Sequence, residues 1–140
     1  MAVNYLAVLV AAVVGWLAGA VWYTALAKPW VAAHGKTMEE FKAEQAAYKG
    51  TLHAWLPFVL AFVAEFVMAL VLYGIATHIK PMSMRSTVMI AVLLWAGVMV
   101  TTMLVNNAFS GRRYMLTVID SGHWLLVIVL MAVVIAWFVV

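Results

Sequence analysis

Four long apolar segments restrict the possible folds of this chain more than any other feature of its sequence. They run from about residue 3 to 27, 56 to 77, 87 to 109 and 114 to 140. A helix needs about 20 apolar residues to cross the hydrocarbon core of a bilayer. Lipid offers no water to unpaired backbone groups, so a helix, which satisfies its own, is the natural spanning element. We therefore expect an all-α polytopic membrane protein, a bundle of four transmembrane helices in a single membrane domain over residues 1–140.

The composition of the chain agrees with this class and argues against several others. Hydrophobic residues make up 69% of the 140 residues and charged residues 9%, whereas soluble domains carry about 25% charged residues. The ten-residue alternation that is typical of transmembrane β-barrel strands is absent. The chain has no cysteine, which excludes a disulfide framework and a thiolate metal site. The formal net charge of the chain is +3. Its basic residues lie in loops that flank the predicted membrane helices, so we expect the lipid bilayer, and not nucleic acid, as the partner.

The basic residues are divided unevenly between the two sides of the predicted bundle. Six of the eight lie in the loops after the first and third helices, and two lie in the loop after the second. Because positive residues favour the cytoplasmic side, we expect loops one and three in the cytoplasm, both termini outside, and the chain in the bacterial inner membrane. The residues counted are Lys28, Lys36, Lys42, Lys49, Arg112 and Arg113 on one side, and Lys80 and Arg85 on the other.

The first loop is the one long polar segment, and it predicts a short helix over about residues 38–49. Thr37 and Glu40 have the spacing of a capping box at its start. Phe41 and Tyr48 are a heptad apart and form a narrow apolar stripe along the helix. We expect this amphipathic helix to lie on the membrane surface or to cover the mouth of the bundle.

Glu65 stands alone in the apolar run FVLAFVAEFVMALVLYG, residues 58–74. An ionisable group at the centre of a membrane helix costs about 2.5 to 3.5 kcal/mol, so such groups usually face the bundle interior and find a partner. Glu65 lies about ten residues from either end of its predicted helix, which places it close to the membrane midplane. Its position fits either a functional site or a structural hydrogen bond between helices.

Other polar residues gather at the helix ends that share the side of loops one and three. If the fourth helix starts near Arg113, Asp120 and His123 form an i, i+3 pair near the depth of Glu65. If it starts at His123, the imidazole lies at the interface. We favour the longer helix because the run YMLTVI is too apolar for an exposed loop. The expected intramembrane polar network or ligand site comprises Glu65, Asp120, His123, Asn106, Asn107, Tyr23, Arg112 and Arg113.

Two further patterns concern helix packing and chemistry. Gly15 and Gly19 form a GxxxG motif in the first helix, which permits close helix contact within the bundle or between protomers. The chain lacks helical His-x-x-x-His spacing, so we expect no metal site and no cofactor. A nucleophile elbow and a phosphate loop are also absent, so no motif argues for an enzyme.

Three segments contain short motifs whose order and spacing are typical of one protein family. They are GWLAGAVWYTALAKPW at residues 15–30, LLWAGVMVTTMLVNNAFSGRR at residues 93–113, and IDSGHWLL at residues 119–126. Together they resemble the bacterial four-helix membrane family known as domain of unknown function 1761, over nearly the whole chain. The resemblance implies a compact membrane domain. It implies no catalytic or binding residue, because the biochemical role of that family is not established.

These observations leave three functional hypotheses. The favoured one is a membrane protein without catalytic machinery that binds a small or amphiphilic ligand, or a partner helix, in a cytoplasm-facing polar pocket, as a homo-oligomer or accessory subunit. The second is a small proton-coupled transporter that uses Glu65. Its size and single membrane carboxylate resemble small multidrug resistance exporters, although their acid lies in the first helix and Glu65 lies in the second. The third is a purely structural scaffold or assembly subunit of a larger membrane complex.

Overall fold

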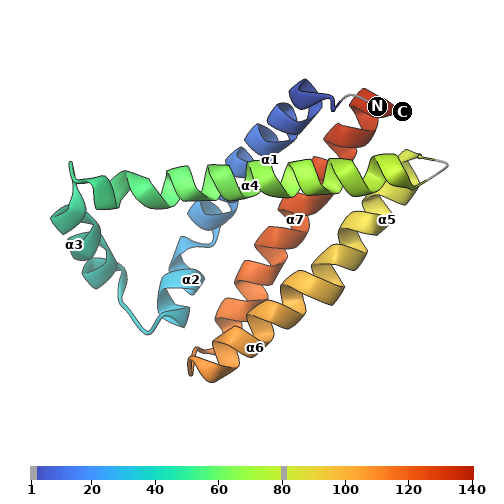
Figure 1. Cartoon of the computed structure of the whole chain (residues 1–140). Helices are drawn as coiled ribbons and strands as arrows, with labels where there is room; N and C mark the ends of the chain where they lie inside the picture. Colours follow the sequence, from blue (N-terminus) through green and yellow to red (C-terminus); the bar gives the residue numbers. More distant parts are fainter. Residues whose placement is uncertain (1–2, 80–81) are drawn as a thin grey trace.

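The structure is a computed structural model that describes residues 3–79 and 82–140 (Figure 1). Four helical segments of 21 to 27 residues are long and apolar enough to cross a membrane. At 1.5 Å per residue they measure about 32 to 41 Å, more than a hydrocarbon core of about 30 Å. Strands are absent from the described residues, which confirms the predicted all-α bundle of four long apolar helices. The four segments are α1 (Tyr5–Ala25), α4 (Leu52–His78), Met84–Phe109 and α7 (Tyr114–Val139).

The third of these segments contains a wider π-helical stretch. It consists of α5 (Met84–Leu94), η1 (Trp95–Val100) and α6 (Thr101–Phe109). It begins before the predicted residue 87 because Ser83 and Ser86 form a capping box, in which each side chain accepts a hydrogen bond from the other residue's backbone N–H. At the start of η1, the indole N–H of Trp95 donates to the carbonyl of Ser121 in α7 at 2.7 Å. This bond ties the π-helical stretch to the last helix.

The first loop contains two short helices, and the sequence predicts only the second. α3 (Met38–Tyr48) has the predicted capping box and ends one residue before the predicted limit of 49. The Thr37 N–H donates to the Glu40 carboxylate at 2.8 Å, and the Glu40 N–H donates to the Thr37 hydroxyl at 3.2 Å. These bonds keep the pKa of Glu40 below its usual range, the Thr37 backbone N–H contributing most. Gly50, with φ of +79°, then turns the chain away from α3.

The helix that the sequence does not predict is α2 (Ala27–Ala33). The predicted first helix runs from 3 to 27, whereas α1 ends at Ala25. Pro29 is the physical reason, because it has no N–H to donate to the carbonyl four residues earlier, that of Ala25. The chain breaks at Leu26 and starts a new helix whose first turn tolerates the proline.

α4 starts earlier than the sequence predicts, whereas α7 starts at the predicted residue 114. α4 begins at Leu52 instead of 56, with Pro57 inside the helix, where it removes only the bond to the carbonyl of His53. α7 begins at Tyr114, which is the longer of the two alternatives for the fourth helix. Asp120 and His123 therefore both lie within a spanning helix.

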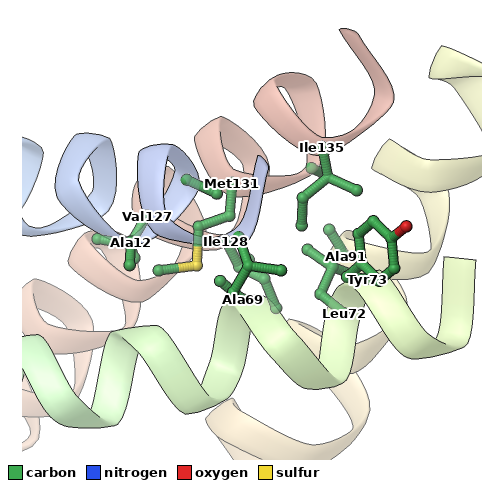
Figure 2. Packing of buried hydrophobic residues seen from close by; sticks show 12 residues of the cluster. Ala12, Ala69, Leu72, Tyr73, Ala91, Val127, Ile128, Met131 and Ile135 are labelled. Atoms are coloured by element: carbon green, nitrogen blue, oxygen red, sulfur yellow. The ribbon is translucent and has the colours of Figure 1, made fainter. Parts of the chain in front are cut away.

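The hydrophobic core cluster lies toward one end of the bundle, and Val31 of α2 and Leu116 of α7 are buried outside it. α7 contacts both α1 and α5, and α4 crosses α1 and α7, as Figure 1 shows. The two chain termini lie at the same end, and the buried hydrophobic cluster of Figure 2 joins α1, α4, α5 and α7 near it. We call this the closed half of the bundle, and define it by Val8, Ala12, Leu72, Met131 and Ile135, all of which are 0 or 1% exposed.

Small residues on α1 explain why the closed half packs tightly. Ala7, Ala11 and Ala12 are fully buried and allow neighbouring backbones to come close. Where α1 begins, Asn4 caps it by accepting from the N–H of Ala7, and the Asn4 N–H donates to the hydroxyl of Tyr73 in α4. The side chain and the backbone N–H of Asn4 are thus both paired within the protein.

Candidate functional site

Beyond the closed half, one face of α1 meets the polar residues of α4 and α7. Gly15, Gly19 and Tyr23 are four residues apart, so they lie above one another on the same face of the helix. Glu65 of α4 lies against Gly15, and His123 of α7 lies against Gly19. Asp120 and Tyr23, from α7 and α1, are hydrogen-bonded to each other.

The two glycines of the GxxxG motif make room for these polar side chains. A Cβ added at Gly15 would lie 2.8 Å from Glu65 Oε2 and 2.8 Å from Met131 Cε. A Cβ added at Gly19 would lie 2.7 Å from His123 Nε2. The motif that the sequence suggested for helix packing therefore packs α1 against the acid and the imidazole.

Glu65 is 2% exposed, although it belongs to a helix whose first half is largely uncovered. Its Oε2 is buried without a hydrogen-bond partner. The nearest groups around the Gly15 contact are apolar atoms of Met131 and Val127. The partner that the sequence analysis expected for this carboxyl is therefore not supplied by the described residues.

His123 is 5% exposed and also carries a buried polar atom, Nδ1, without a hydrogen-bond partner. Its ring lies between two aromatic rings, with centroid distances of 4.8 Å to Tyr23 and 4.7 Å to Trp124. The imidazole is thus fixed by packing and not by hydrogen bonds.

Asp120 differs from Glu65 and His123 because it is paired. Its Oδ1 accepts hydrogen bonds from the Tyr23 hydroxyl at 2.8 Å and from the Trp30 indole N–H at 3.2 Å. Trp30 belongs to α2, so the unpredicted helix supplies the second donor. The predicted i, i+3 pair of Asp120 and His123 is joined through Tyr23, which bonds the first and packs on the second.

The arginines do not join this group, contrary to the expectation of a buried charge network. Arg113 donates through Nη1 to the carbonyl of Ala32 in α2 at 2.9 Å, and Arg112 is exposed. Since α7 starts immediately after Arg113, Asp120 lies about 10 Å further along the helix. In residues 3–79 and 82–140 the one ion pair is Lys36–Glu44.

The two asparagines at the end of α6 also stand apart from the acid and the imidazole. The Asn107 amide donates to the Thr117 hydroxyl of α7 at 2.9 Å, which ties α6 to α7. The Asn106 side chain is exposed. Lys80, part of the predicted charge asymmetry, lies outside the described residues.

Three tryptophans that the predicted site does not include contribute to it. Trp22 lies against Gly122, where an added Cβ would be 2.9 Å from its ring, and its indole nitrogen is buried without a hydrogen-bond partner. Trp16 donates to the carbonyl of Phe58 in α4 at 3.1 Å. Trp30 bonds Asp120, as described above.

A cavity of about 1390 Å³ opens beside Glu65 and His123. It lies between α1 and the first half of α4 and is bordered by α2, α3 and part of α7. In Figure 1 this half of α4 runs away from α1 and α7 toward α3. Most of the lining is apolar or aromatic, and Glu65 and His123 form the polar end, which we call the floor. We call this part of the molecule the open half.

The described residues contain no group of three or more His, Cys, Asp or Glu side chains that could hold a metal ion. Among the described residues of this site, no nucleophilic side chain is paired with a base. The arrangement can bind a molecule through aromatic walls and a few polar atoms, which is the usual character of ligand pockets.

Comparison with known proteins identifies the family of this chain. The model of the family described as "Protein of unknown function (DUF1761)" matches residues 6–136. The chain therefore belongs to this family, as the resemblance of its motifs predicts. No curated protein and no solved structure matches the chain.

Proposed function

We propose that this member of the DUF1761 family binds a small or amphiphilic ligand within the membrane, in the cavity of the open half. One observation carries the proposal: Glu65 and His123 are almost fully buried, line this cavity, and each has a buried polar atom without a hydrogen-bond partner. Leaving such an atom unsatisfied costs about 1 to 3 kcal/mol. Rotation of the two side chains toward the cavity that they line would let a bound molecule pair with these atoms and recover that free energy.

The surroundings of the two residues support an amphiphilic ligand. Trp16, Trp55, Phe58 and Trp124 line the cavity and provide large apolar surfaces. Ligand pockets typically combine such walls with a small number of polar groups that fix orientation. The volume exceeds the usual range of about 300 to 1,000 Å³, which suits a ligand with a long apolar part.

A neutral fluorescent probe, N-phenyl-1-naphthylamine, tests this proposal in purified protein. Ala64 lines the cavity, and an Ala64→Trp substitution would fill part of it. Val63 is the preceding residue, is 52% exposed and does not line the cavity, so Val63→Trp is the matched control. We expect saturable probe binding that Ala64→Trp abolishes and Val63→Trp retains. Equal binding by both variants would contradict the proposal.

Proton-coupled transport is a second candidate function, and the position of Glu65 favours it. The carboxyl lies in the middle of α4 and lines a cavity, so a proton on it could exchange with a cationic substrate. Addition of tetraphenylphosphonium to purified protein would then release protons, and Glu65→Gln would abolish the release. Absence of release from the unmodified protein would eliminate this candidate.

The orientation of the chain belongs to the same proposal. Loops one and three face the cytoplasm and both termini face the outside of an inner membrane, so the cavity is reached from the cytoplasmic side. The support is the excess of lysine and arginine in these two loops. A C-terminal alkaline phosphatase fusion should be active and a C-terminal green fluorescent protein fusion dark, and the reverse pattern would contradict this orientation.

The assembly state is the last part of the proposal. The protein acts as a homo-oligomer or as an accessory subunit of a membrane complex; the first half of α4 leaves apolar residues such as Trp55, Phe58 and Leu60 uncovered, a surface that a partner helix can cover in place of lipid. Mass measurement after extraction in a mild detergent tests this part. A monomer without a copurifying protein would contradict it.

A further inference from the structure

The basic and the acidic residues in and next to α3 differ in their position relative to the cavity. Lys42 and Gln45 of α3 line it, together with Lys49, which directly follows the helix. The three acidic residues of α3 are absent from its lining: Glu39 is exposed outside it, Glu40 is engaged in the capping box, and Glu44 forms an ion pair with Lys36 at 2.6 Å. The side of the cavity formed by α3 is therefore positively charged.

These two lysines have no acidic partner within the part of the chain that the structure describes. The one ion pair there is Lys36–Glu44, which lies away from the cavity lining. An ammonium group without a counter-charge next to an apolar cavity attracts an anion. The lysines are thus free to bind an acidic group of a molecule that occupies the cavity.

The remainder of the cavity suits an apolar chain. From Trp55, near the level of α3, to Glu65 at the floor, α4 rises by about 15 Å. Phe58, Leu60 and Ala61 line this stretch on α4, and Trp16 faces it from α1. The lining along α4 is therefore apolar between Trp55 and Glu65, while Tyr23 and Thr24 add hydroxyl groups from α1.

We propose that the ligand is an anionic amphiphile, whose phosphate or carboxylate group binds Lys42 and Lys49 and whose hydrocarbon chain runs along α4 toward Glu65. This inference rests on the proposed function, since it names the class of ligand for the same cavity. A cationic ligand is disfavoured because two lysines face the cavity against the single carboxyl of Glu65, whose Oε2 is turned to the Gly15 contact. A phospholipid of the bilayer and a free fatty acid share the required chemistry.

Quenching of tryptophan fluorescence by brominated amphiphiles tests the inference, because four of the tryptophans line the cavity. The probes are brominated phosphatidylglycerol, brominated oleate, brominated phosphatidylcholine and a brominated alkyltrimethylammonium, each titrated into purified protein in a nonionic detergent. We expect tighter binding of an anionic probe than of the zwitterionic and cationic ones. Preference for phosphatidylglycerol over oleate would identify a membrane lipid, and the reverse a free acid.

The double substitution Lys42→Gln and Lys49→Gln should weaken binding of the anionic probe about 30-fold, because each lysine near an anionic surface contributes about a factor of five. Lys42→Arg with Lys49→Arg should retain binding. The matched control, Lys28→Gln with Arg112→Gln, removes the same charge on the same side from exposed residues outside the cavity lining, and should have little effect.

Two results would overturn the inference. One is a cationic or zwitterionic probe that binds as tightly as the anionic ones, and the other is an equal loss of binding in the control and in the lysine variant. In both cases an amphiphile still binds, so the proposed function survives. If none of the four probes quenches the fluorescence, the proposed function fails together with the inference.

Discussion

Leu72 and Leu60 belong to the same apolar helix, α4, yet their surroundings are opposite. Leu72 is 1% exposed in the closed half, whereas Leu60 is 57% exposed beside the cavity of the open half. Hydropathy does not distinguish the two positions, since both lie in one continuous apolar run. The comparison teaches that hydropathy specifies which segments span the membrane, and that the crossing of α4 over α1 and α7 decides which part of a segment is packed.

The residues of α1 account for much of the difference between the halves. In the closed half it presents alanines, against which apolar side chains of α4 and α7 pack. In the open half it presents Gly15 and Gly19, which contact Glu65 and His123. Small residues thus serve close packing at one end of α1 and accommodate polar groups at the other.

We expect the largest effect on stability when the side chain of Leu72 is truncated. Leu72→Ala leaves a cavity in a fully packed region and should lower the free energy of unfolding by about 2 to 5 kcal/mol. Leu60→Ala removes the same atoms from the same helix where no core surrounds them, and should cost less than about 1 kcal/mol. Reversible unfolding in mixed micelles measures both. Equal costs would show that the open half is packed like the closed half.

Glycine substitutions sharpen the comparison at the contact between α1 and α7. Gly19→Ala pushes a methyl group against His123 Nε2 and should lower the free energy of unfolding by about 1 to 3 kcal/mol. Gly74 has no atom within 4 Å of an added Cβ, so Gly74→Ala should be neutral or stabilise the helix by up to about 1 kcal/mol. If both variants have the same free energy of unfolding in this assay, the close contact assigned between Gly19 and His123 is wrong.

Removal of the Tyr23 hydroxyl tests the paired part of the site. Tyr23→Phe deletes one of the two hydrogen bonds to Asp120, and bonds between membrane helices are worth about 0.6 kcal/mol on average and up to about 1.7. Tyr114→Phe is the control, because this tyrosine is 73% exposed at the start of α7. A loss of stability in the control as large as in Tyr23→Phe would contradict the assigned bond.

The smallest effect concerns α3 and depends on pH. The folded-state pKa of Glu40 is lowered by the Thr37 N–H, so the ionised carboxylate stabilises α3 at pH values above its unfolded pKa of about 4.3. This contribution is lost as the pH falls through the lower, folded-state pKa. Hydrogen exchange of the α3 amides should therefore accelerate more in acid for the unmodified protein than for Glu40→Gln. Identical pH profiles would exclude the capping role.

The sequence was sufficient to predict the spanning helices and one short helix, because these depend on local patterns. Long apolar runs specify α1, α4 and α7, and the Thr37–Glu40 spacing specifies the start of α3. The short helix α2 was not predicted, because Pro29 suggests a loop and the break at Leu26 leaves no signal of a new helix. Two helix starts lie a few residues before the predicted ones: that of α4, which contains Pro57, and that of α5, where Ser83 and Ser86 form a capping box.

The candidate site was predictable only in part. The depth of Glu65 and the shared face of Asp120 and His123 follow from helix geometry. Their contacts with Gly15, Gly19 and Tyr23 depend on the register between helices, which the order of residues along one chain does not specify. For the same reason Arg112 and Arg113 were assigned to the network, and Trp30, a donor to Asp120, was left out of it.

Thiol labelling tests the central claim, the cavity of the open half, most directly. The chain has no cysteine, so each variant carries a single reactive site. Ala64→Cys lies in the cavity lining, Ala69→Cys in the closed half, and Val63→Cys on the outer face of the same helix. In liposomes, we predict that a water-soluble methanethiosulfonate reagent modifies Ala64→Cys much faster than the other two. Equal rates at the three positions would contradict a cavity that opens to water on one side of the membrane.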